Sequence, residues 1–419
     1  MRKQLRNARP SRWLLPLVTA LLIFGLSGLP AQAQKNKKAK PATGVQEPAT
    51  TTFDIRKIVW PTPPEIARVK FEDILTGQPI DWAGLESKKK KKMSWMDRLA
   101  GVQPDDQVKD VEKKIGFQLI RVYGVAADSK GNVYAADQAV DAIFIFPYDK
   151  SQPLQLIKNG QDAHFGLLNG LAMDDNDRLF VTDLKLHRVL VFNAKHQLED
   201  SFGGDVLVSP AGIALDTANR FVYVVDTQQD QALVFDADSY KLLRRIGTSG
   251  KKHTLTDPGD FSLPTNVAVD QQGNLYVTDT LNNRVESFDA DGNFIGQFGT
   301  PGDGPGHFAR PKGIAIDCDG HIWVADEVQN RVQVFDQSGR LLIYFGGLGW
   351  YPGQFQALYG IAYDSKNNRV ITSEQFPGRV QVFQYVTDAE AATERARHEA
   401  GGETPAPKPA GSTSQKGGV

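Results

Sequence analysis

Residues 310–346, RPKGIAIDCDGHIWVADEVQNRVQVFDQSGRLLIYFG, decide the expected fold. This stretch contains four short runs rich in Ile, Val, Leu, Phe and Trp, and polar turns that carry glycine or asparagine separate them. Short strand-forming runs with such turns are typical of an antiparallel meander. A sheet of this kind is apolar on both faces, so it is stable only when it packs face to face against similar sheets.

Similar units recur from Val122 to Tyr385. The first run of each unit has a recognisable core, namely YGVAAD from Tyr123, NGLAMD from Asn169, AGIALD from Ala211, NVAVD from Asn266, GIAID from Gly313 and GIAYD from Gly360. The anchors at positions 124, 170, 212, 266, 313 and 360 are 46, 42, 54, 47 and 47 residues apart. A period in the forties with short strands is typical of propeller blades. We therefore expect an all-β chain with six blades in residues 118–386.

The sixth unit is one strand short. It has strand patterns near Gly360–Tyr363, Arg369–Ser373 and Arg379–Tyr385, but it lacks the fourth run ending in Phe-Gly or Ile-Gly that units two to five have. Residues 66–74, IARVKFEDI, alternate apolar and charged side chains in their middle, which indicates a strand. We expect residues 53–75 to form a strap and a closing strand, because completing the sixth sheet removes its unpaired edge.

Residues 1–33 have the order of a secretory signal: a basic head, an apolar run from Trp13 to Leu29, and the small-residue exit Ala31-Gln32-Ala33. We expect an exported protein, periplasmic or extracellular; the alternative is an uncleaved segment that anchors the protein to a membrane. Without these residues the chain has 43 basic and 49 acidic side chains, a net charge of −6. That charge argues against a nucleic-acid partner, because such binders usually concentrate basic charge on one face.

The other segments outside the repeats differ in composition. Residues 34–52 are polar and predict a disordered linker, whereas residues 76–117 predict an insertion with a short amphipathic helix. The run Lys88-Lys92 in this insertion is expected to be solvated, and membrane contact through it or through the N-terminal segment is the less favoured alternative. Residues 387–419 predict a helix from Asp388 to Ala400 and then a disordered tail.

The units are similar to NHL repeats. The resemblance lies in P-x-G-I-A-x-D, Y/W-V-x-D, N-R-V-x-x-F-D and a final F-G; it covers residues 119–385 and is strongest through Leu263–Gly299 and Arg310–Gly346. It implies a six-bladed β-propeller. It does not imply one function, because NHL proteins include binding platforms, sensor domains, RNA-binding modules and a few enzymes.

Amidating lyases are similar six-bladed proteins that hold zinc through histidines near the channel, which requires converging imidazoles. The residues just before the expected inner strands are not histidines here; they are Tyr123, Asn169, Ala211, Thr265, Lys312 and Tyr359. His164 and His307 lie farther out. We therefore expect no catalytic residue, no metal site and no cofactor. Cys318 is the only cysteine, so no intramolecular disulfide can form, and we expect it to be half-buried and unreactive.

Two sets of recurring carboxylates are expected to be structural. In D-x-x-x-N-R the carboxylate can pair with the guanidinium and pin the loop between strands two and three. The motif and its variants run from Asp183 to Arg188, Asp279 to Arg284, Asp326 to Arg331 and Glu374 to Arg379. The aspartates that end the first runs can accept backbone hydrogen bonds in the next turn. They are Asp128, Asp174, Asp216, Asp270, Asp317 and Asp364.

The loops between strands two and three open onto the same rim of the ring as the connections between units. We expect this rim to receive a protein, peptide or carbohydrate partner through Tyr123, Asn169, His187, Arg188, Lys312, Arg331, Tyr359 and Arg379. The expected function is a non-catalytic binding or scaffolding module. A metal-dependent lyase or lactonase acting at the channel remains the alternative.

Overall fold

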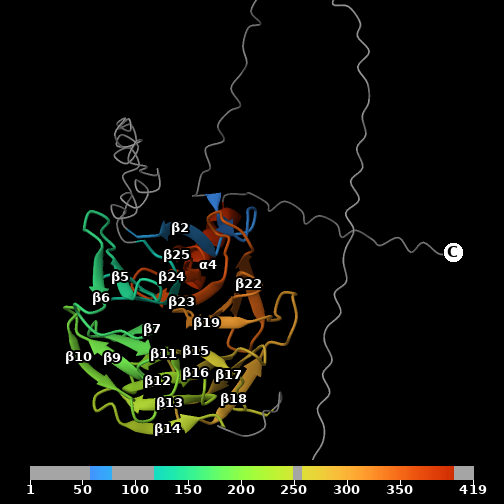
Figure 1. Cartoon of the computed structure of the whole chain (residues 1–419). Helices are drawn as coiled ribbons and strands as arrows, with labels where there is room; N and C mark the ends of the chain where they lie inside the picture. Colours follow the sequence, from blue (N-terminus) through green and yellow to red (C-terminus); the bar gives the residue numbers. More distant parts are fainter. Residues whose placement is uncertain (1–56, 78–117, 249–256, 401–419) are drawn as a thin grey trace, which may run out of the picture. The chain divides into compact units, whose positions relative to one another are not determined.

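The computed structural model describes residues 57–77, 118–248 and 257–400, which all belong to one compact unit, Phe53–Val419. These residues form six antiparallel sheets, and their first strands surround a common centre, as Figure 1 shows for β7, β11, β15, β19 and β23. The all-β, six-bladed prediction is confirmed. The expected signal segment, linker, insertion with Lys88-Lys92 and tail from residue 401 lie outside the described residues.

Each of the first five blades is a four-stranded meander that runs from the centre outward. Blade 1 consists of β3 Val122–Ala127, β4 Val133–Asp137, β5 Ala142–Phe146 and β6 Gln155–Lys158. Blade 2 consists of β7 Leu168–Met173, β8 Leu179–Asp183, β9 Arg188–Phe192 and β10 Leu198–Phe202. Blade 3 consists of β11 Pro210–Asp216, β12 Phe221–Asp226, β13 Gln231–Asp236 and β14 Leu242–Ile246. Blade 4 consists of β15 Pro264–Val269, β16 Leu275–Asp279, β17 Arg284–Phe288 and β18 Phe294–Phe298. Blade 5 consists of β19 Pro311–Ile316, β20 Ile322–Asp326, β21 Arg331–Phe335 and β22 Leu341–Gly346.

Blade 6 combines both ends of the described chain. Its first three strands are β23 Leu358–Asp364, β24 Arg369–Gln375 and β25 Gly378–Tyr385. β2 Val69–Leu75 pairs antiparallel with β25, with Phe71 opposite Phe383, and β1 Val59–Trp60 adds a fifth strand. The closing strand therefore lies at residues 69–75, a few residues later than the expected 66–74.

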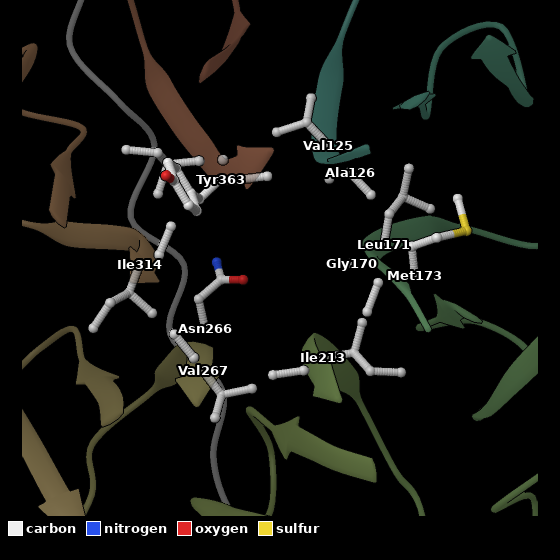
Figure 2. Close-up of a pocket in the computed structure, with 18 of the residues that line it drawn as sticks. Val125, Ala126, Gly170, Leu171, Met173, Ile213, Asn266, Val267, Ile314 and Tyr363 are labelled. Carbon is white, nitrogen blue, oxygen red and sulfur yellow. The ribbon is translucent and has the colours of Figure 1, made fainter. Parts of the chain in front are cut away.

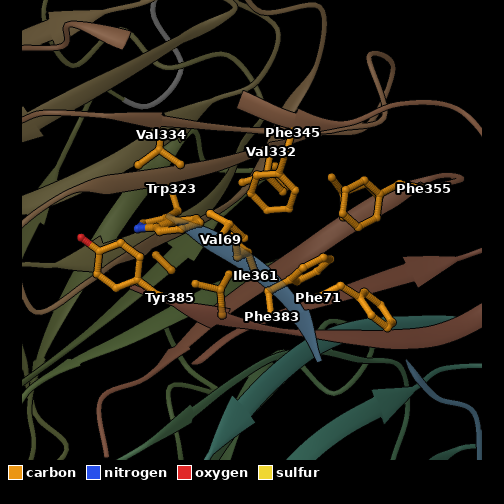
Figure 3. Close-up of a cluster of buried hydrophobic side chains, with 14 residues drawn as sticks. Val69, Phe71, Trp323, Val332, Val334, Phe345, Phe355, Ile361, Phe383 and Tyr385 are labelled. Carbon is orange, nitrogen blue, oxygen red and sulfur yellow. The ribbon is translucent and has the colours of Figure 1, made fainter. Parts of the chain in front are cut away.

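The closing strand packs against the neighbouring blade as well as pairing with its own. Val69 and Phe71 of β2 lie in one buried cluster with Trp323 and Phe345 of blade 5 and with Phe383 (Figure 3). Phe71 and Phe383 meet edge to face with ring centroids 5.7 Å apart. Aromatic pairs of this geometry stabilise a core beyond the area they bury. β2 thus links blades 5 and 6 across the point where the ring closes.

The glycine in the first strands allows the blades to meet at the centre. A Cβ on Gly124 would lie 2.2 Å from the carbonyl oxygen of Asn169 in the next inner strand. The equivalent distance for Gly360 is 2.4 Å to the carbonyl oxygen of Tyr123, which brings blade 6 against blade 1. Real Cβ atoms do not approach backbone this closely, so glycine is required at this position in every blade except blade 4, where Asn266 stands.

In every blade, the start of the first strand and the end of the second lie at the same end of the sheet; Pro311 opposite Asp326 is an example. We call this end the rim face. It comprises the connections between blades and the turns between second and third strands: 118–121, 138–141, 159–167, 184–187, 203–209, 227–230, 247–248, 257–263, 280–283, 299–310, 327–330, 347–357 and 376–377.

α4 Asp388–Ala400 follows β25 at the opposite end of the sheets and lies where the Ala/Glu/Arg pattern predicts it. Its first turn is capped reciprocally: the Thr387 amide donates to Glu390 Oε2 at 2.9 Å, and the Glu390 amide donates to Thr387 Oγ1 at 3.3 Å. Among the described residues, no helix is long and apolar enough to cross a membrane.

Candidate functional site

Buried carboxylates hold the rim face in shape. Asp326, at the end of β20, accepts backbone hydrogen bonds from Ala309 in the connection before its blade and from Val328 and Gln329 in the next turn, at 2.8–3.1 Å. The carboxylates at the ends of the other second strands are equally buried, and each accepts a backbone N–H from the connection before its blade: Asp137, Asp183, Asp226, Asp279 and Glu374. Asp137, Asp183 and Asp226 also accept backbone N–H groups of the next turn, so in these blades, as in blade 5, one side chain fixes two loops.

The expected carboxylate–arginine pair forms in only two of the four motifs. Arg284 donates to Asp279 at 2.9 Å, and Arg379 donates to both oxygens of Glu374 at 2.7 and 3.0 Å. Arg331 does not reach Asp326; it contacts Gln329 and the carbonyl oxygens of Asp303 and Gly304. For Arg188, no pair with Asp183 is present, and its Nε is buried without a hydrogen-bond partner among the described residues.

A second set of buried side chains that hold the rim loops was not predicted from the sequence; we call each of its hydrogen bonds to a loop glycine a brace. Glu286, Gln333 and Gln381 occupy equivalent places in the third strands of blades 4, 5 and 6, and their side-chain oxygens accept the backbone N–H of Gly259, Gly306 and Gly353, each at 2.8 Å. Two residues after each glycine, a phenylalanine is completely buried: Phe261, Phe308 and Phe355. The joint recurrence of R-V-E/Q and P-G-x-F in these three blades was the available signal.

Four of the predicted rim residues meet at the mouth of the channel. Tyr123, Asn169, Lys312 and Tyr359 are the second residues of their inner strands, not the residues before them. The rings of Tyr123 and Tyr359 meet at 4.6 Å, and Asn169 Nδ2 donates to the Tyr359 hydroxyl at 3.4 Å. Lys312 Nζ lies 5.6 Å from the centre of the Tyr359 ring. We call these four residues the mouth cluster.

The mouth carries an excess of positive charge. Glu327 lies 4.0 Å from Lys312 Nζ and 3.6 Å from Arg310, so one carboxylate faces two cations. Arg121 adds a further positive charge that acts electrostatically on Tyr123. Burial lowers the pKa of Lys312, because desolvation disfavours its charged form, although Glu327 opposes the shift. Burial also raises the pKa of Tyr359, so this phenol stays neutral at ordinary pH.

Behind the mouth lies a channel of about 220 Å³ between the inner strands. Figure 2 shows apolar side chains such as Val125, Leu171 and Ile213 around it, and the amide of Asn266 points into it. The described residues that line the channel include no histidine, cysteine or carboxylate. This donor set does not fit the zinc of an amidating lyase or another catalytic metal, which needs several such ligands.

The other predicted rim residues lie away from the mouth. His187 is at the tip of the turn between β8 and β9, where its Nδ1 contacts the carbonyl oxygen of Val208. Arg331 lies over the ring of Tyr344 on the outer strand β22. Arg379 is buried, and it donates to the carbonyl oxygens of Trp350 and Gln354 at 2.8 and 2.7 Å, so it supports a loop.

The rim face exposes many large apolar side chains, which the sequence analysis did not predict. Every blade contributes at least one: Ile120, Leu167, Val208, Leu263, Leu281, Val328, Leu348, Trp350, Tyr351 and Phe376. The densest group is on blade 6, where Trp350 and Phe376 meet with ring centroids 5.7 Å apart. The connection 347–357 that carries this group has no charged residue. We call Leu348, Trp350, Tyr351 and Phe376 the aromatic patch.

Outside the rim face, the prediction for the inner-strand aspartates is confirmed, whereas the prediction for the burial of Cys318 is wrong. The aspartates that end the inner strands accept turn N–H groups as expected; Asp270, for example, accepts those of Gln272 and Asn274 at 2.9 and 2.8 Å. Cys318 is exposed rather than half-buried, because it sits in the turn after β19. Desolvation raises the pKa of its thiol all the same, which disfavours the reactive thiolate.

Comparisons with known proteins agree with this architecture. The NHL repeat model matches residues 308–335, and the SMP-30/gluconolactonase/LRE-like region model matches residues 201–309. A probable peptidyl-alpha-hydroxyglycine alpha-amidating lyase of Caenorhabditis elegans is 30% identical over 110 residues, which are 26% of this chain and 31% of that protein. Peptidyl-glycine alpha-amidating monooxygenase of Mus musculus is 27% identical over 250 residues, 52% of this chain and 25% of that protein.

The chain thus spans about a quarter to a third of the length of these curated relatives. Among solved structures, a protein of unknown function from Bacteroides thetaiotaomicron superposes with a TM-score of 0.52 at 18% identity, covering 64% of this chain and 70% of that one. A likeness at this identity concerns the fold alone. The six sheets identify the chain as a six-bladed β-propeller, and residues 308–335 match the NHL repeat model.

Proposed function

We propose that this is an exported binding module that captures an extended segment of a protein partner on its rim face. The observation that carries the proposal is the set of ten large apolar side chains exposed there, with the aromatic patch as its densest part. Large exposed apolar patches usually mark interaction sites, and buried Trp and Tyr anchors supply much of the binding free energy at interfaces.

The exposed fractions give a scale for this effect. Trp350, Tyr351 and Phe376 are 57%, 68% and 61% exposed. A fully buried aromatic side chain removes about 150–250 Å² from water, so covering what is exposed here gains about 2–4 kcal/mol for each ring before the costs of association. Two such anchors gain about 4–8 kcal/mol before the costs of association, whereas a micromolar affinity needs about 8 kcal/mol net. The other exposed side chains of the rim face and the mouth cluster must therefore contribute to a micromolar complex.

The mouth cluster adds chemical selectivity. Arg310 and Lys312 both lie near the carboxylate of Glu327, and Arg121 adds a further positive charge near Tyr123, so an acidic side chain of the partner is favoured at the mouth and a basic one is repelled. Asn169 and Tyr359 supply polar groups beside this charge. The preferred segment therefore combines aromatic or aliphatic side chains with acidic ones. The described channel lining lends no support to a metal-dependent lyase or lactonase.

Selection from a displayed peptide library tests the proposal. We expect selected peptides to be enriched in acidic and large apolar residues, and to lose at least about tenfold in affinity toward the double variant Trp350→Ala/Phe376→Ala, because both anchors are removed. Lys312→Gln should weaken acidic peptides and leave neutral variants of the same peptides unaffected.

The matched control is Phe294→Ala/Ile295→Ala on β18, which removes exposed apolar side chains from the outer edge of blade 4 and not from the rim face. This variant should bind as the natural chain does. Peptides that bind equally well to the rim variant and to the control would refute the proposal.

A further inference from the structure

The start of α4 is held to blade 5 by a network of polar side chains on the face opposite the rim. Asp388, the first residue of the helix, is bound by the guanidinium of Arg68, and its backbone N–H donates to Asp319 Oδ2 at 2.8 Å. His321 Nε2 lies 3.7 Å from Asp388 Oδ2. Arg68 precedes β2, so this network joins the closing strand, blade 5 and the helix.

The hydrogen bonds determine which nitrogen of His321 carries a proton. The Tyr385 hydroxyl gives its only hydrogen to Asp319 Oδ2 at 2.7 Å and accepts from Arg68 at 3.2 Å. His321 Nδ1 lies 3.0 Å from that hydroxyl and 3.1 Å from Asp317 Oδ2, a carboxylate oxygen that can only accept. Nδ1 must therefore be the donor. A neutral His321 then presents the lone pair of Nε2 to the carboxylate of Asp388.

Protonation of Nε2 changes this contact from repulsion to an ion pair. The charged groups that face His321 are Asp317 and Asp319 from blade 5, Asp388 from α4, and Arg68 from the strap; Tyr385 from β25 is neutral. Three carboxylates against one guanidinium favour the imidazolium. The hydrogen bond to Asp317 contributes most to raising the pKa of His321, and desolvation opposes it.

We propose that His321 is a proton-operated clasp that holds the N-terminus of α4 against blade 5 in its charged form and loosens it in its neutral form. The sign follows from linkage: a histidine whose pKa is raised by docking contributes stability below its free pKa, and that contribution is lost as pH rises through the docked pKa. Arg68 keeps a residual hold on Asp388 at high pH, so the helix becomes less protected without leaving the sheet.

The repeats supply a matched variant. Asn132 and Asn274 stand at the position of His321 in blades 1 and 4, and each donates from Nδ2 to the aspartate at the start of its turn, at 2.8 and 2.9 Å. His321→Asn should therefore keep the bond to Asp317 and the turn, and remove the titration together with the contacts to Asp388 and to the Tyr385 hydroxyl.

Amide hydrogen exchange of α4 in the full-length protein tests the clasp. The natural chain and the variant are compared at the same pH, so the intrinsic pH dependence of amide exchange cancels. The amides of β20 serve as the internal reference. Near pH 5, α4 should exchange faster in His321→Asn than in the natural chain, by about tenfold for each unit of pKa shift caused by docking, and near pH 8 the two should converge.

A second variant, Asp388→Asn, keeps the histidine and removes its charged partner. Its α4 should be less protected overall and should show the weak pH dependence of His321→Asn. The proposal is overturned if the ratio of exchange rates between natural chain and His321→Asn is the same at both pH values, or if Asp388→Asn retains the pH dependence of the natural chain.

Discussion

Substituting Glu286 by glutamine should stabilise the protein at alkaline pH. Glu286 is completely buried in β17, where it contacts Arg284 and accepts the Gly259 N–H at 2.8 Å. Blades 5 and 6 use Gln333 and Gln381 for the same brace, so an amide oxygen can replace the carboxylate without loss of the hydrogen bond. Arg284 retains Asp279 at 2.9 Å as its anionic partner after the change.

The magnitude follows from the ionisation of Glu286. Burial raises the pKa of this carboxyl from 4.5 to about 7, a shift that the nearby Arg284 only reduces. A raised pKa means that the folded state favours the protonated acid, so this group costs nothing well below pH 4.5, costs progressively more stability between pH 4.5 and about 7, and reaches its full cost above pH 7. The difference of roughly 2.5 units is worth about 3 kcal/mol once the carboxylate is fully ionised.

Urea unfolding from about pH 4 to pH 9 measures the effect. Glu286→Gln should equal the natural chain near pH 4 and exceed it by about 3 kcal/mol near pH 9, because glutamine mimics the protonated acid. The converse variant Gln333→Glu places an acid in blade 5, where Arg331 is engaged by Asp303 and Gly304, and should create a loss of stability that grows with pH. A gap that stays constant with pH, or widens toward acid, would refute the role of burial.

Two further predictions concern the ring. Val69→Asp puts a charge into the fully buried cluster between blades 5 and 6, and calorimetry should show a loss of at least about 3 kcal/mol; an unchanged melting temperature would contradict the packing of β2. Gly360→Ala places a Cβ 2.4 Å from the Tyr123 carbonyl oxygen and should lower the free energy of unfolding by about 1–3 kcal/mol or more. In the control Gly204→Ala the new Cβ meets nothing within 4 Å, so the free energy of unfolding should change by no more than about 0.5 kcal/mol. Equal melting temperatures for these two alanine variants would show that the blades can separate at no cost.

The architecture was predictable because its signals are repeated. The inner-strand glycine recurs at a spacing set by the size of a blade, and because its requirement is steric it appears in five of the six inner strands, with Asn266 in blade 4 as the exception. The position of the closing strand was less exact: β2 begins at Val69 rather than at residue 66, and the alternation of apolar and charged residues breaks at Asp73, where a bulge after Phe71 shifts the register with β25. Local pattern does not contain such a bulge.

The partners of individual charges were not predictable in the same way. Arg284 and Arg331 close the same D-x-x-x-N-R motif, yet only the first pairs with its aspartate. Arg284 also contacts Glu286 two residues farther on, whereas Arg331 contacts Gln329 and the carbonyl oxygens of Asp303 and Gly304. The charge two residues farther on does not decide the pairing by itself, because Arg379 pairs with Glu374 although Gln381 stands at that place. The partner of each arginine depends on the loop of its own blade, which the short motif does not contain.

The same braces explain why the aromatic patch is suited to binding. Arg379 ties the carbonyl oxygens of Trp350 and Gln354 to Glu374, and Gln381 holds the N–H of Gly353 in the same connection. The backbone under the exposed rings is thus fixed from below by buried hydrogen bonds. An interface that is already ordered does not pay the entropy of ordering its loops when a partner binds, so more of the free energy of burying Trp350 and Phe376 remains as affinity. Under the proposed function, buried polar residues of blade 6 would therefore contribute to recognition without touching the partner.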